Sequence, residues 1–117
     1  MDMNGNKIYA VDFDGTLSLG VRWPEVGFPN MELFRFLKEH KETGSRIILY
    51  TCRTGEHLAD AIAYCKKHGL EFDAVNENLP ELVEAYGSDS RKINADYYID
   101  DKNIDVNALN KILAGMI

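Results

Sequence analysis

Residues 7–16 read KIYAVDFDGT, an apolar run that ends on two aspartates, a glycine and a threonine. The segment 7–13 is short, apolar and rich in strand-forming residues, so we predict a buried strand. Side chains two positions apart in an extended segment share a face, which puts Asp12 and Asp14 side by side where the strand ends. Their carboxylates repel each other unless a positive charge lies between them. The stretch therefore predicts either a polar turn or a binding site.

Three further strand-like segments alternate with helical patterns along the chain. Strands are expected at 46–51, 72–75 and 95–100, and helices at 31–42, 56–68, 80–86 and from residue 105 or 106 onward. Asn30 and Thr54 are the expected N-caps of the first two helices. This alternation implies parallel βαβ units, so we predict an α/β fold, a Rossmann-like three-layer α/β/α sandwich with a central, mainly parallel sheet.

Length, charge and cysteine content limit the number of domains and the classes of protein to which the chain can belong. The 117 residues fit a single core domain, 1–117, and the net charge of −6 provides no broad basic surface for nucleic acid. The N-terminus has no signal-peptide pattern and no segment approaches the length of a membrane span, so we expect a cytoplasmic protein without membrane contact. Cys52 and Cys65 are too few for a disulfide scaffold.

The expected strands end on polar groups. Asp12 closes the first, Thr51 the second, and Asp100 and Asp101 the last. Ligands of open parallel sheets bind beyond the carboxyl ends of the strands, so these groups are expected to converge. With Asp14 they form an oxygen-rich set without histidine or cysteine, and such a set suits Mg²⁺.

A phosphate group fits the same set of residues. Mg²⁺ commonly shares its coordination with a substrate phosphate. A hydroxyl, from Thr51 or Thr16, and a cation, from Lys92 or Arg91, can complete a phosphate-binding shell. An aspartate can also act as the nucleophile and form an aspartyl-phosphate.

The segments DFDGT (12–16) and LYT (49–51), then Lys92 and IDD (99–101), resemble in this order the four motifs of the haloacid dehalogenase-like phosphohydrolases. The first motif of that family, D-x-D-x-T after an apolar strand, is matched without departure. The resemblance spans residues 7–101 and implies a Mg²⁺-dependent phosphatase that acts through an aspartyl-phosphate.

The resemblance also implies a role for each matched residue. Asp12 is expected to be the nucleophile and a Mg²⁺ ligand. Asp14 is expected to act as the acid and base, with its backbone carbonyl on the metal. Asp100 is expected to bind the metal directly, and Asp101 to act through water or through the ligands.

Five residues are expected to handle the phosphate or the substrate. The resemblance assigns Thr51 to a phosphoryl oxygen and Lys92 to charge compensation, with Arg91 as the alternative cation. Gly15 and Thr16 are expected to contact the substrate. Arg53, in TCRTGE, either reaches a substrate oxyanion or is simply solvated.

Larger relatives of this type carry a cap domain, for which the chain leaves no room. The substrate is then a phosphorylated small molecule or macromolecular end, and a neighbouring subunit can cover the site. The irregular loop 16–28, with Trp23 and Phe28, is the only intrinsic candidate for a lid. The alternative function is a non-catalytic phosphate- or Mg²⁺-binding regulatory module with the same fold.

Other readings of these motifs fail on spacing. A calcium loop counted from Asp12 needs glycine at its sixth position and glutamate at its twelfth, where the chain has Leu17 and Trp23. Neither cysteine starts a C-x₅-R motif, and no P-loop or dinucleotide fingerprint occurs.

Overall fold

A parallel four-stranded sheet forms the centre of the molecule. The computed structural model describes residues 1–116, so Ile117, the end of the predicted domain, lies outside the described residues. The sheet order is β5-β4-β1-β6, and all its pairs are parallel. The strands are β1 (Ile8–Val11), β4 (Arg46–Leu49), β5 (Ala74–Val75) and β6 (Tyr97–Ile99). Each is shorter than its expected segment, and the polar end residues lie just beyond the strands.

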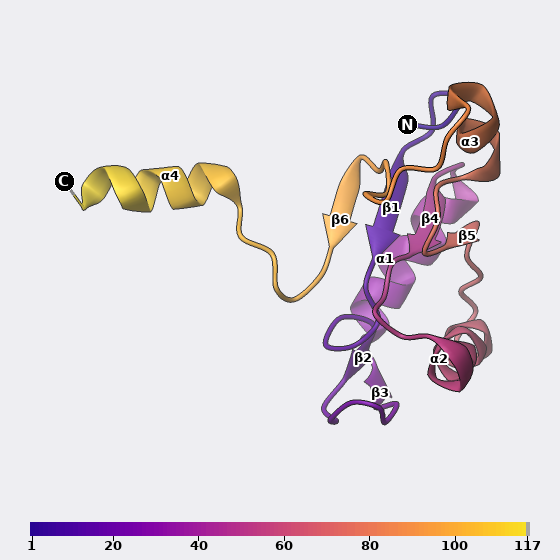
Figure 1. Ribbon diagram of the computed structural model, residues 1–117. Helices are drawn as coiled ribbons and strands as arrows, with labels where there is room; N and C mark the ends of the chain where they lie inside the picture. The colour runs from indigo at the N-terminus through magenta and orange to yellow at the C-terminus, as the bar shows by residue number, and fades with distance from the viewer. Residues whose placement is uncertain (117) are drawn as a thin grey trace.

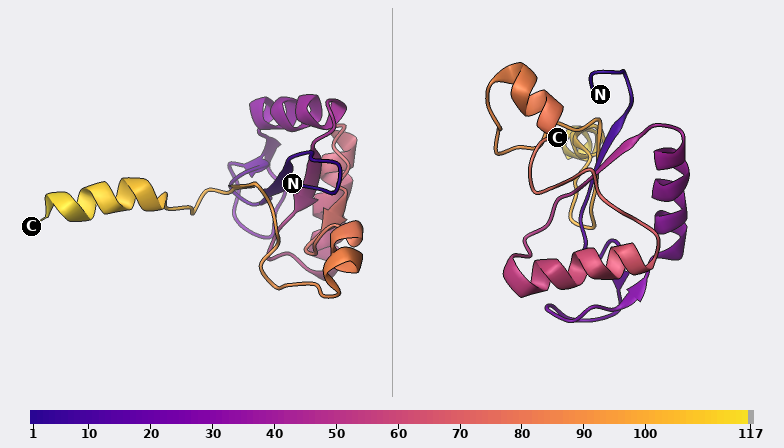
Figure 2. Two further views of the ribbon diagram at one scale, coloured as in Figure 1. Left: turned by 90° about the horizontal axis from the view of Figure 1, so that it is seen from above. Right: turned by 90° about the vertical axis from the view of Figure 1, so that its right-hand side faces the viewer.

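Helices cover both faces of this sheet, which confirms the Rossmann-like sandwich (Figures 1 and 2). Along β1, residues alternate between two buried clusters, because successive side chains of a strand face opposite ways. Tyr9 and Val11 pack with α1 (Met31–Glu42) and α2 (Gly55–Lys67). Ile8 and Ala10 pack with α3 (Pro80–Tyr86).

The segment expected as an irregular loop contains a small hairpin. Strands β2 (Ser18–Leu19) and β3 (Phe28–Pro29) pair antiparallel beyond the carboxyl end of β1 (Figure 1). Two strands of two residues each give too little alternation to be recognised in a sequence. The strands meet closely at Gly27, where a Cβ atom would lie 1.9 Å from the carbonyl oxygen of Leu19. We call residues 18–29 the flap.

Helix α4 (Val106–Gly115) stands apart from the rest of the described chain. It begins where the pattern predicts, and the Asp105 carboxylate accepts a hydrogen bond from the Asn107 amide. All of its residues are exposed, so it joins neither helical layer of the sandwich. Among residues 1–116 no helix has the length and apolarity that a membrane span requires.

Asn30 links the first helix to the loop after β1. Its side chain accepts a hydrogen bond from the Leu33 amide at 3.3 Å, as expected of an N-cap, and donates one to the Thr16 carbonyl at 3.1 Å. Thr54 occupies the N-cap position of α2, but its side chain makes no capping bond. One predicted cap is therefore formed by its side chain and the other is not.

We expect Asn30→Ala to lower the free energy of unfolding by about 1 kcal/mol, because it leaves a helical N–H and a loop carbonyl without their partner. Thr54→Ala is the matched control, since it removes an N-cap side chain that makes no bond, and it should cost less than about 0.5 kcal/mol. Urea unfolding of both variants measures the difference. Equal losses would contradict this account of the two caps.

Candidate active site

Three adjacent strands deliver polar groups to one open pocket of about 260 Å³. Asp12 follows β1, Thr51 follows β4 and Asp100 follows β6, and all three residues line the pocket. The apolar walls come from Ala10, Tyr50, Tyr98 and Ile99. The carboxyl ends of these strands thus bring together an acid, a hydroxyl and a second acid that lie far apart in the sequence.

Asp12 lies in an electrostatically unfavourable position. Burial and the nearby carboxylates of Asp14, Asp101 and Asp100 raise its pKa above the ordinary value of 3.8, while a hydrogen bond from the Phe13 amide opposes the shift. That bond, 2.7 Å long, fixes one oxygen of the Asp12 carboxylate. The other oxygen has no hydrogen bond from a described residue, so it can serve a cation or a phosphorus atom.

Asp14 is turned toward Arg53. The Nε and Nη2 atoms of Arg53 donate to its two carboxylate oxygens at 2.9 and 2.7 Å, a bidentate ion pair. The Arg53 side chain is fully buried, and its guanidinium lies 4.9 Å from the centroid of the Phe13 ring. Asp14 thus lies near Asp12, as the i, i+2 spacing predicts, but its carboxylate is bound to Arg53, which follows the neighbouring strand β4.

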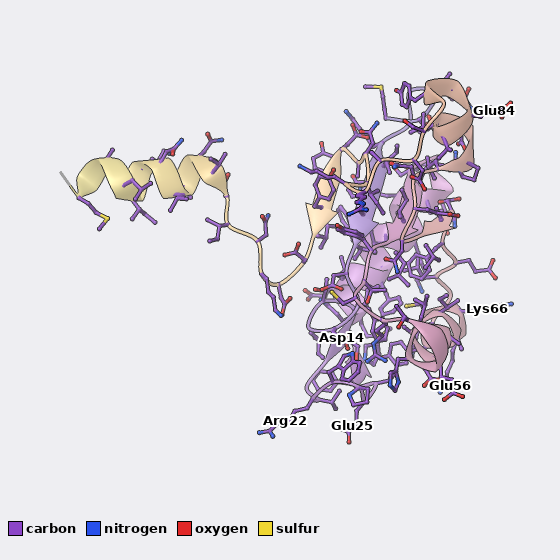
Figure 3. All side chains as sticks on the ribbon, viewed as in Figure 1. Asp14, Arg22, Glu25, Glu56, Lys66 and Glu84 are labelled. Carbon is purple, nitrogen blue, oxygen red and sulfur yellow. The ribbon has the colours of Figure 1, made fainter. Side chains whose placement is uncertain are left out.

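Arg53 also holds the flap. Its Nη2 atom donates to the Glu25 carbonyl at 3.0 Å, and its Nη1 atom to the His57 carbonyl at 3.2 Å. Asp14 and Glu25 lie at the same end of the molecule (Figure 3). Most N–H groups of the Arg53 guanidinium are therefore bonded inside the protein, and a direct contact between Arg53 and a substrate requires some of these bonds to break.

Thr51 is set by its neighbours on two sides. Its backbone N–H donates to the Asn76 side chain at 2.8 Å, and its hydroxyl accepts from the Arg53 backbone N–H at 3.1 Å. Asn76 has a positive φ of 54° and follows β5, so it forms a further polar strand end. Asn76 was not predicted from the sequence, although a polar residue directly after a strand, as at the other strand ends, was the available signal.

Gly15, Thr16 and Asp101 lie in a second hollow, which shares Ile99 and Asp100 with the first. Gly15 has a φ of 74°, and a Cβ atom there would lie 2.3 Å from an oxygen of Asp101. Only glycine therefore lets the turn come this close to the carboxylate. The Thr16 hydroxyl is buried and has no hydrogen-bond partner among the described residues.

Neither of the two cations predicted for the site, Lys92 and Arg91, lines the pocket. The Lys92 ammonium sits 5.5 Å from the centroid of the Tyr98 ring, against a pocket wall but outside the lining, and Arg91 is exposed. Lys102, which the sequence analysis did not single out, does line the pocket. Its position directly after the acidic pair was the available signal.

The loop that carries Lys92 is anchored by a buried amide. Asn78 donates to the Asp89 carboxylate at 2.7 Å and to the Ser90 carbonyl at 3.1 Å, and it accepts from the Asn94 N–H at 2.7 Å. This clamp fixes both ends of the short stretch around Lys92. No spacing in the sequence pointed to it.

The described residues contain no group of three or more histidine, cysteine, aspartate or glutamate side chains spaced to hold a metal ion. The chemistry of the donors nevertheless fits a hard divalent cation. Asp12 and Asp100 share a pocket, their donor atoms are oxygens, and the pKa of Asp12 is raised first by burial and then by the nearby carboxylates. The carboxylates of Asp12 and Asp100 are the groups in this pocket that suit Mg²⁺.

The raised pKa of Asp12 predicts how stability depends on pH. Between the ordinary value of 3.8 and the raised value the folded chain binds more protons than the unfolded chain, so stability falls as the pH rises through this window. Above the window the loss is complete. We therefore expect Asp12→Asn to raise the Tm at neutral pH without metal, and to leave it unchanged at about pH 3.

Calorimetry at the two pH values measures this effect, and Asp60→Asn, at an exposed position on α2, is the matched control. Added Mg²⁺ should raise the Tm of the wild type and leave that of Asp12→Asn nearly unchanged. A Tm for Asp12→Asn at or below that of the wild type at neutral pH would refute the proposed charge strain.

Two of the comparisons with known proteins are negative: no protein-family model and no curated protein sequence matches the chain. Among solved structures, a conserved protein from Bacteroides thetaiotaomicron is 36% identical in sequence, with a TM-score of 0.74. The match covers 97% of this chain and 93% of that protein. The similarity thus extends over nearly the whole of both chains. The chain belongs to the same family as this conserved Bacteroides protein.

Proposed function

We propose that the chain is a Mg²⁺-dependent phosphatase of the haloacid dehalogenase-like type, which transfers a phosphoryl group from a phosphate monoester to Asp12 and then to water. The observation that carries the proposal is the meeting of Asp12, Thr51 and Asp100 in one pocket at the carboxyl ends of β1, β4 and β6. The ordered motifs around these residues support it independently.

The pocket offers the groups that a phosphate monoester needs. In the proposal, the Thr51 hydroxyl binds a phosphoryl oxygen, and Lys92 or Lys102 compensates its charge. Mg²⁺ on Asp12 and Asp100 would lower the repulsion between the carboxylate and the phosphate dianion.

The first step forms a bond between an Asp12 oxygen and phosphorus and breaks the bond from phosphorus to the leaving oxygen. Asp14, after it separates from Arg53 and takes a proton from solvent, gives that proton to the leaving oxygen. In the second step water attacks phosphorus, the bond to Asp12 breaks, and Asp14 takes a proton from the water. Inorganic phosphate leaves, Asp12 is again a free carboxylate, and Asp14 returns its proton to solvent when it pairs with Arg53 again.

Arg53 controls when Asp14 can act. Both oxygens of Asp14 accept bonds from Arg53, so Asp14 delivers a proton to a leaving group only after this pair loosens. The same guanidinium holds the Glu25 carbonyl of the flap. In the proposal, a movement of the flap on substrate binding draws Arg53 away and frees Asp14. The hydrogen bond between Arg53 and Glu25 would thus couple the lid predicted for residues 16–28 to Asp14.

We expect phosphate release from an aryl phosphate in the presence of Mg²⁺. Asp12→Asn should lower kcat by about a thousandfold or more, because it removes the nucleophile. Asp14→Asn should lower it by roughly a hundredfold or more, because it removes the acid and base. Asp60→Asn, far from the pocket, should keep the wild-type rate.

The alternative function has a different outcome in this assay. A non-catalytic phosphate- or Mg²⁺-binding module would bind phosphate and Mg²⁺ in calorimetry and release nothing from a broad panel of phosphate esters. Turnover that survives Asp12→Asn would also overturn the proposal.

A further inference from the structure

Helix α4 carries an apolar stripe that nothing in the described chain covers. Positions three and four apart share a helix face, and this face is formed by Val106, Leu109, Ile112, Leu113 and Met116. Val106 and Ile112 are 61% and 62% exposed, and Leu113 is 49% exposed. The opposite face holds Asn107, Asn110, Lys111 and Ala114.

Such a helix needs a partner. An isolated helix of ten residues is only marginally stable in water, and in proteins helical stability comes mainly from packing of the apolar face. An exposed stripe of this size is typical of a surface that binds another surface.

The central sheet has a matching hollow. Helices α1 and α2 cover one face, whereas only α3 covers the other (Figure 2). On this second face, Ala10, Tyr50 and Tyr98 line an open pocket beside β1 and β6, and Tyr50 is 45% exposed. The wall of this pocket formed by Ala10, Tyr50 and Tyr98 is apolar, and it lies next to the strand from which the chain leaves toward α4.

The chain does not place its own helix in this hollow. After β6, residues 100–105 lead away from the sheet, and α4 extends outward from the body (Figures 1 and 2). The apolar stripe of α4 and the apolar wall of the hollow are therefore separated within one chain, and each remains without an apolar partner among the described residues. Two copies related by a two-fold axis satisfy both at once.

We propose that two copies of the chain form a dimer by exchange of α4, with the apolar stripe of each α4 against the wall formed by Ala10, Tyr50 and Tyr98 beside β1 and β6 of the other copy. Charge does not oppose this contact. Residues 104–116, which we call the arm, hold one acidic and one basic residue, Asp105 and Lys111, whereas the whole chain has a net charge of −6. The arm is thus a part of the chain that an acidic copy accepts with little repulsion.

The exchange also bears on the site, because the same pocket contains Asp12, Thr51 and Asp100. In the dimer, the arm of the partner forms an apolar wall next to these residues. The dimer is a property of the surface and does not depend on whether the pocket catalyses phosphate release.

Light scattering after gel filtration of the full chain tests the dimer. We expect a mass twice the 13.3 kDa of one chain. Leu109→Asp/Leu113→Asp, on the stripe, should give a monomer. Asn110→Asp/Ala114→Asp adds the same charge at the same spacing away from the stripe, and it should remain dimeric. A monomeric wild type, or a dimer that both double variants keep, overturns the proposal.

Cross-linking separates exchange from closure within one chain. Cys52 is exposed and lines the hollow, whereas Cys65 is buried and its pKa is raised to about 12. A short bis-maleimide should join Cys52 to a cysteine introduced by Leu113→Cys and give a covalent dimer, which Cys52→Ser should abolish.

A link between the same positions within a monomer would show that α4 folds back onto its own sheet, and this result would overturn the exchange. Absence of any link between Cys52 and position 113 would do the same. Because the body of the chain does not depend on α4 for its core, circular dichroism should show a folded body in every variant.

Discussion

The repulsion among carboxylates at the end of the sheet is the constraint on which the rest of the site depends. Parallel strands β1 and β6 are neighbours, so the acids that follow them arrive at the same edge. Burial and the neighbouring carboxylates both raise the pKa of Asp12. The protein keeps the arrangement although it opposes folding, and such a concentration of like charge is typical of a functional site.

The positive charges near this edge have different positions and different roles. Arg53 is fully buried and neutralises Asp14, which reduces the repulsion but also occupies both carboxylate oxygens of Asp14. Lys92 and Lys102 are exposed, and Lys102 lines the pocket in which a phosphate is proposed to bind. In the proposed enzyme, one buried cation therefore sets the resting state of the acid and base, and the outer cations serve the ligand.

Much of the fold follows from local patterns. The apolar run KIYAVDF reflects a strand buried on both faces, the periodicity of residues 31–42 and 56–68 reflects burial of one helix face, and the structure confirms these elements. Two features do not follow from such patterns. The flap strands are too short to show a period, and the stripe of α4 predicts a buried face without saying which surface covers it.

The site shows the same division. The convergence of Asp12, Thr51 and Asp100 was predictable because parallel strands align their carboxyl ends. The bidentate pair of Arg53 with Asp14 was not, because it depends on how the turn after β4 faces the turn after β1. The support of Thr51 by Asn76 and of the Lys92 loop by Asn78 likewise comes from tertiary contacts between segments that no motif joins.

In the proposed enzyme, Asp12 accepts a phosphoryl group with the help of Mg²⁺. Fluoroberyllate imitates a phosphoryl group on a carboxylate, so this step can be tested by fluorine NMR of the protein with Mg²⁺ and fluoroberyllate. We expect a bound signal in the wild type and in Asp60→Asn that disappears when Mg²⁺ is removed and is absent in Asp12→Asn. A signal that persists in Asp12→Asn, or its absence in the wild type at saturating Mg²⁺, would contradict the proposal.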